Sequence, residues 1–271
     1  MSHSTLCSQL FEDTTQGKYR RDRPLPADID DRLAKLSFAG FTGIVTGYDG
    51  MLEDLQVAHI LAQATRLKFI RALEQVMGIP VSKLNLHCVS NVCFMQLSTH
   101  LSFDEGEAYL SPTKEILERV WHAVNNCGLP LGQTTVPPGV ATNEAGYVPY
   151  DMAIPDGIRE YDFVPVVGEA AWCPCRPVVR QDGEEHTVYK APFEGVNRIP
   201  ALMLHLNPYF VVMHAYGVLV KDRESPVTIP EHVREQADLI KKIGERIHSV
   251  AHTWSVSQAA LREKKAAEKT H

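Results

Sequence analysis

The 271-residue sequence predicts an α+β protein: a mainly antiparallel β-sheet with helices packed on one face, in a single domain. The first supporting observation is a series of apolar runs of strand length, separated by turn-forming residues. The second is the recurrence of apolar residues at helical spacing in 52–77, 111–128 and 228–254. The third is an ordinary globular composition, with 44% hydrophobic and 22% charged residues.

Charge and hydropathy argue against two classes of partner. The formal net charge of −6 argues against nucleic acid, because phosphate binding needs a basic surface. No apolar run reaches the ~20 residues of a membrane span, so no membrane partner is expected. The first residues lack the apolar core of a signal peptide, so we expect a cytoplasmic protein whose six cysteines are reduced thiols.

Composition along the chain predicts three segments. Residues 1–24 form a polar N-terminal arm, 25–255 a single α+β domain, and 256–271 a charged C-terminal tail. The arm carries a basic cluster, and we expect it to be ordered only where it crosses onto a neighbouring subunit. The sequence therefore favours a homo-oligomer.

The first part of the domain is predicted to run from a short helix at 28–36 to a buried strand at Phe41–Thr46. The glycine-rich turn 47–50 follows the strand and precedes a helix, an arrangement in which free backbone N–H groups can hold an anion. Because no phosphate-binding glycine motif is present and Asp49 would repel a phosphate, we favour Asp49 as a helix cap.

Residues 52–77 are predicted to form one long amphipathic helix. His59 and Arg66 lie within its apolar stripe. A buried arginine is costly unless it pairs with a carboxylate or a bound anion. The two interpretations are an internal ion pair and a bidentate clamp on the carboxylate or phosphate of a substrate. Arg66 and His59 are therefore candidate substrate-binding residues.

The middle of the chain is predicted to alternate strand, helix and loop. Residues 83–103 are a strand region with a break near Ser90–Asn91. Ser111 and Pro112 are typical of the cap and first residue of an amphipathic helix, which Gly128 ends. Residues 128–160 are rich in proline and lack periodicity, so we expect an ordered loop that covers either a pocket mouth or a subunit contact.

Residues 161–191 are predicted to form two or three strands, with a turn at Asp182–Gly183. They contain an unusual cluster in which Cys173 and Cys175 flank a proline, and Glu169 lies just before it. Because proline cannot donate to a sheet, the cluster indicates an edge or a bulge, which often adjoins an active site. Core packing is the alternative for the thiols. Cys175 and Glu169 are kept as candidate catalytic residues.

Residues 199–221 are predicted to form the central hairpin, with its turn at Asn207–Pro208. Each strand carries one histidine in an apolar run, His205 and His214, and a central strand leaves a histidine either an internal hydrogen bond or a cavity. We expect at least one of them to open onto the main pocket as an acid–base residue, with Tyr216 as a substrate contact. The two would lie roughly 13 Å apart, too far to share one metal ion. After this hairpin, Thr228–Glu231 is typical of a capping box that opens the last helix.

Two functional classes remain open. The first is a small-molecule enzyme, lyase- or isomerase-like or metal-assisted, that uses histidine acid–base chemistry on a small carboxylated or phenolic substrate. The second is a noncatalytic ligand-binding or oligomeric assembly protein whose buried His, Cys and Arg are structural. The density of histidines in apolar segments favours the enzyme. The sequence identifies neither a metal nor an organic cofactor.

Overall fold

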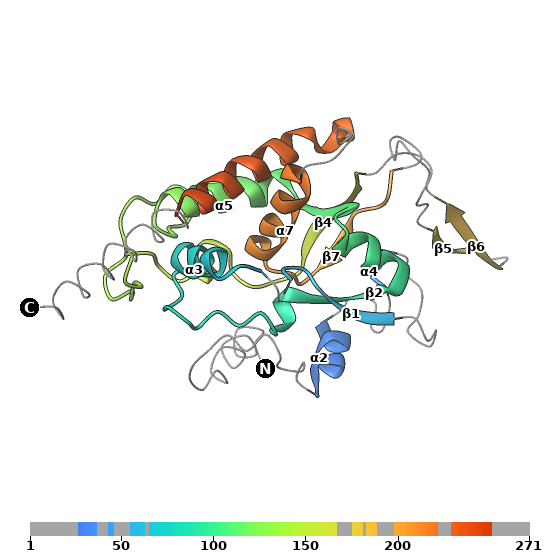
Figure 1. Cartoon of the computed structure of the whole chain (residues 1–271), viewed down its shortest axis with the longest axis horizontal. Helices are drawn as coiled ribbons and strands as arrows, with labels where there is room; N and C mark the ends of the chain where they lie inside the picture. The colour runs from blue at the N-terminus through green and yellow to red at the C-terminus, as the bar shows by residue number, and fades with distance from the viewer. Residues whose placement is uncertain are drawn as a thin grey trace, which may run out of the picture.

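The protein is described by a computed structural model over residues 27–36, 43–45, 55–62, 65–166, 175–180, 183–188, 198–221 and 229–250. Figure 1 shows the arrangement of the helices and strands. In chain order they are α2 (Ile29–Leu36), β1 (Leu55–His59), α3 (Leu67–Val76), η1 (Val89–Asn91), β2 (Val92–Gln96), α4 (Leu97–Asp104), β3 (Ala108–Pro112), α5 (Lys114–Asn125), α6 (Tyr150–Ala153), β4 (Arg159–Pro165), β5 (Cys175–Arg180), β6 (Gly183–Val188), β7 (Leu202–Leu204), α7 (Pro208–Val220) and η3 (Glu231–Val233). Residues 234–250 form a further helix.

The α+β class is confirmed, and every strand pair in the described part of the chain is antiparallel. The strands form small sheets rather than one large one. β1 pairs with β2, β5 pairs with β6, and β4 lies between β3 and β7. The predicted strands of 161–191 are present as β4, β5 and β6, with Arg180 opposite Gly183.

The central element is helix α7, which replaces the predicted 199–221 hairpin. Figure 1 shows α7 in the middle of the molecule, and it packs against β3 and α5. Asn207 caps it by accepting a hydrogen bond from the Tyr209 N–H at 2.9 Å, and Pro208 occupies its first turn. The hairpin prediction was wrong because Asn-Pro also starts helices, and a run that is apolar on all sides has no period to separate helix from strand.

The predicted helix 52–77 is also wrong in its first half. Residues 55–59 form β1, which pairs residue by residue with β2, and the helix begins only after Arg66. Arg66 is exposed at the N-cap of α3, so it does not lie in a buried stripe. Pairing with β2 overrides the helix propensity of this segment. The predicted strand at 41–46 is described only at 43–45, which form a turn, and Asp49 lies outside the described residues.

The predicted break near Ser90–Asn91 is present as η1, and Asn91 holds it in place. Its buried side chain accepts from the Leu61 N–H at 2.9 Å and donates to the carbonyls of Leu61 and Leu86 at 3.1 and 2.9 Å. Beyond β2 the predicted strand becomes helix α4. The helix predicted from 111 is present as α5, but Ser111 and Pro112 belong to β3 and Thr113 is the N-cap.

The proline-rich loop 128–160 covers the C-terminal end of α3. The Asn143 side chain donates to the Gln75 carbonyl at 2.9 Å. Two tyrosines of the loop itself, Tyr147 and Tyr150, are buried. Gly78, in the left-handed region at φ +66°, lies directly against the carbonyl of Val148. The loop is therefore packed onto the domain, and its predicted role over a pocket mouth or a subunit contact stays a prediction.

Helix α2 is attached differently from the other helices. Its buried residues Ile29 and Leu33 form a small apolar cluster with Val89, Val92 and Phe94, separate from the main core. Burial of two such side chains contributes about 3–6 kcal/mol, at about 1.5–3 kcal/mol each. Figure 1 shows α2 at the edge of the molecule, below β1 and β2. None of the helices in the described ranges is long and apolar enough to cross a membrane.

Candidate functional site

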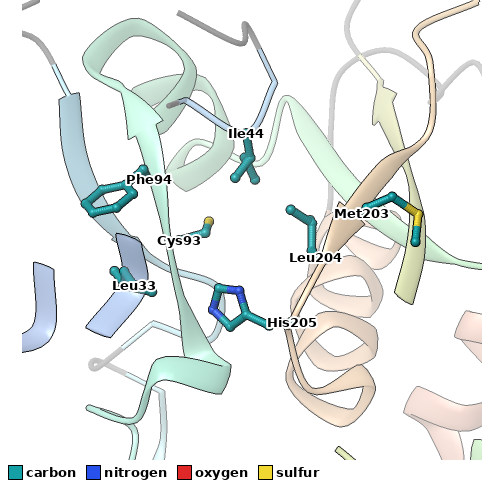
Figure 2. A pocket seen from close by; sticks show the side chains of 7 residues that line it. All are labelled: Leu33, Ile44, Cys93, Phe94, Met203, Leu204 and His205. Carbon is teal, nitrogen blue, oxygen red and sulfur yellow. The ribbon is translucent and has the colours of Figure 1, made fainter. Parts of the chain in front are cut away.

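A small pocket lies between strands β2 and β7, where the two sheets approach each other. Its empty volume of ≈ 240 Å³ includes open solvent, and the closed pocket has room for about one water molecule. Figure 2 shows the lining side chains, which come from α2, from the 43–45 turn and from both strands. They are Leu33, Ile44, Cys93, Phe94, Met203, Leu204 and His205. The described part of the lining is therefore apolar apart from one imidazole and one thiol.

His205 has a defined tautomer in this pocket. Its Nε2 lies 2.8 Å from the carbonyl oxygen of Val89. Since a carbonyl oxygen only accepts hydrogen bonds, Nε2 carries the proton, and Nδ1 of the neutral ring carries the lone pair. In Figure 2 one ring nitrogen points toward β2 and the other into the space between Cys93 and Leu204. Nδ1 is thus the basic atom that faces the pocket.

The charge state of His205 follows from its surroundings. Burial lowers the pKa of the imidazole, and the carbonyls of Val89 and Val92 offset part of this effect because they favour the protonated ring. The ring is therefore neutral at pH 7 and able to accept a proton. The two carbonyls would stabilise the imidazolium that forms.

Cys93 contributes a thiol but not a nucleophile. The side chain is 1% exposed, and burial strongly raises the pKa of its thiol. A protonated, inaccessible thiol is a poor nucleophile. In the closed pocket Cys93 therefore acts as an apolar wall.

Among the described residues that line the pocket, none is an arginine or a lysine. Arg66, the candidate carboxylate ligand, is exposed at the start of α3 and is not among the lining residues, so that role is not supported. Arg198 instead pairs with the buried Asp162 of β4 at 2.8 Å. A carboxylate in the pocket would find no cationic partner among the described lining residues, and an unpaired charge is costly in an apolar site.

His214 lies on α7, away from the pocket lining. Its ring stacks on Phe103 of α4, with the centroids 3.8 Å apart, and Nε2 donates to the Phe103 carbonyl at 3.4 Å. Burial lowers its pKa to about 4, although the Phe103 carbonyl acts in the opposite direction. The structure thus separates the two candidate histidines, and the contacts of His214 are those of a packing residue.

His59 belongs to a different group of histidines. Its ring meets that of His87 edge to face, with centroids 5.4 Å apart. Burial and, to a smaller extent, the charges of His87 and His100 together lower the pKa of His59 to about 4. In the described part of the chain, no three His, Cys, Asp or Glu side chains converge to hold a metal ion.

The remaining candidates do not lie in the pocket lining or cannot be placed. Tyr216 of α7 is half-buried against Gly244, where a Cβ atom would come within 2.1 Å of its ring. Tyr216 therefore packs two helices together. Cys175 pairs through its backbone with Val188 at the start of β5. Glu169 and Cys173 lie outside the described residues.

Sequence reasoning found His205 as a polar residue in an apolar run but missed the rest of the pocket. Leu33, Ile44 and Cys93 come from three distant segments, and no local pattern brings them to one place. Comparison with protein-family models, curated proteins and solved structures gives no match.

Proposed function

We propose that the protein is a small-molecule enzyme in which Nδ1 of His205 accepts a proton from the hydroxyl group of a small phenolic substrate. The observation that carries this proposal is the 2.8 Å bond from Nε2 to the Val89 carbonyl, which leaves the lone pair of Nδ1 facing an apolar pocket. In the proton transfer, the phenolic O–H bond breaks, the proton moves to Nδ1, and the oxygen keeps the electron pair. A cytoplasmic homo-oligomer is part of the proposal and rests on the sequence alone.

The phenolic class is preferred to the carboxylated class for an electrostatic reason. A neutral phenol can donate to Nδ1 and bury its ring against Cys93, Leu204 and Ile44, which Figure 2 shows beside the imidazole. A carboxylate can only accept hydrogen bonds, and it would meet a second acceptor at Nδ1 with no cation among the described lining residues. The pocket therefore favours a neutral donor.

Noncatalytic binding of the same ligand class is the second candidate. The pocket lining favours this alternative, because His205 is the one acid–base group among the described lining residues. The raised pKa of the Cys93 thiol keeps Cys93 from acting as a second acid–base group. In this alternative, His205 only anchors the ligand through a hydrogen bond.

Phenol and benzoate distinguish the donor-binding pocket from a general apolar site. At pH 7 we expect phenol to bind with Kd of about 1 mM, or about −4 kcal/mol. We expect benzoate to bind at least about tenfold more weakly, because its charge would be buried without a partner. Calorimetric titration of both ligands measures the difference. Equal affinities, or no binding of phenol at concentrations well above 1 mM, would contradict the proposal.

A further inference from the structure

Turn η1 presents backbone carbonyls to the segment that carries His205. In Figure 2 the His205 ring reaches from the end of β7 toward β2, the strand that η1 precedes. The Val89 carbonyl accepts a hydrogen bond from Nε2 of this ring at 2.8 Å, and the Ser90 carbonyl accepts from the Asn207 N–H at 2.9 Å. The Val92 carbonyl, directly after the turn, also favours the protonated ring. The orientation of η1 therefore decides which ring nitrogen of His205 carries the proton.

Asn91, the last residue of η1, ties the turn to two other segments. Its side-chain amide accepts from the Leu61 N–H and donates to the carbonyls of Leu61 and Leu86. Its backbone carbonyl accepts from the Ile60 N–H at 2.8 Å. Asn91 is fully buried, and neither it nor these partners are among the lining residues of the pocket. Asn91 can therefore act on the turn without touching the pocket.

Loss of the side-chain bonds of Asn91 would reach His205 through the turn. A three-residue 3₁₀-helix has poor hydrogen-bond geometry of its own, so η1 depends on contacts with other segments. Without the Asn91 amide, the buried carbonyls of Leu61 and Leu86 lose a partner, and the turn shifts to pair or hydrate them. Since a hydrogen bond weakens steeply with distance and misalignment, a shifted Val89 carbonyl holds the Nε2 proton less firmly.

We infer that Asn91 is a positioning residue for His205: it aims the Val89 carbonyl at Nε2 and so keeps the Nδ1 lone pair toward the pocket. The inference deepens the proposed function and rests on His205 as the acceptor in the pocket. The tautomer of His205 is measured without any ligand. A failure of this inference is therefore distinguishable from a failure of the proposed function.

The test removes the amide of Asn91 and follows the tautomer of His205. Asn91→Ala deletes all three side-chain bonds without introducing a charge. The ¹⁵N NMR spectrum of the His205 ring in the full chain at pH 7 gives the ratio of the Nε2–H to the Nδ1–H tautomer. We expect this ratio to fall about tenfold in Asn91→Ala, as for the loss of one hydrogen bond. Asn91→Ser, whose hydroxyl can restore one bond, should lie between Asn91→Ala and the wild type.

Asn143→Ala is the matched control, because the Asn143 side chain also bonds to backbone groups, at Gln75 and Tyr147, but far from η1 in the sequence. It should lose stability and leave the tautomer ratio of His205 unchanged. A wild-type ratio in Asn91→Ala, whatever its loss of stability, overturns the inference, and so does an equal change in Asn143→Ala. If Asn91→Ala does not fold, Asn91→Ser is judged by the same two criteria. Failure of phenol to bind the wild type would instead contradict the proposed function.

Discussion

Replacing Gly78 with alanine is expected to destabilise the protein by about 2–5 kcal/mol. At φ +66° a side chain is strained, and a Cβ atom would lie 2.0 Å from the carbonyl oxygen of Val148. The left-handed conformation costs about 1–2 kcal/mol, and overpacking against backbone adds about 1–3 kcal/mol. Urea unfolding followed by circular dichroism measures the loss in free energy of unfolding.

Gly139→Ala is the matched control for this prediction. Gly139 also has a positive φ, +81°, but a Cβ atom there would meet nothing within 4 Å. It should therefore show only the conformational cost of about 1–2 kcal/mol. Equal losses in the two variants would show that Val148 does not lie against Gly78 and that the 128–160 loop packs differently.

Replacing His205 with glutamine is expected to weaken phenol binding about tenfold. The glutamine amide can still donate to the Val89 carbonyl, but it places no acceptor at the position of Nδ1. Loss of one hydrogen bond to the ligand costs about 1–1.5 kcal/mol, which corresponds to about tenfold in Kd. If the protein turns over a phenolic substrate, loss of the general base reduces kcat about 10²–10⁴-fold.

His214→Gln is the control, because His214 is also buried and bonded to a backbone carbonyl but does not line the pocket. It should bind phenol as the wild type does. Calorimetric titration compares the three proteins after thermal melts establish that each is folded. Unchanged affinity in His205→Gln, or an equal loss in His214→Gln, would remove His205 from the site.

Elements with strong local signals were predictable from the sequence. The regular apolar stripe of α5 and Gly128 after it identify this helix, although the helix begins at 114 rather than at the predicted 112. The pair β5–β6 is bounded by turn residues and was predicted as strands. In these cases, propensity, periodicity and end signals all favour one structure.

Elements with ambiguous local signals were not predictable. Asn207-Pro208 is typical of both a type I turn and a helix start, and the run after it is apolar on every side. Residues 55–59 fit the apolar pattern of a helix. They form a strand because they pair with β2, which lies more than 30 residues later in the sequence. The candidate site depends on these two segments and on the distant Leu33. Of the lining residues, the sequence alone therefore identified only His205.

The most direct test of the account is the ¹⁵N NMR spectrum of the His205 ring with and without phenol, assigned by comparison with His205→Gln. The account predicts a neutral ring at pH 7 with the proton on Nε2, and a pKa below 6.5, because burial disfavours the charged form. Phenol should shift the Nδ1 resonance while Nε2 stays protonated. A ring that is charged at pH 7, a proton on Nδ1, or an Nδ1 resonance that does not respond to saturating phenol would contradict it.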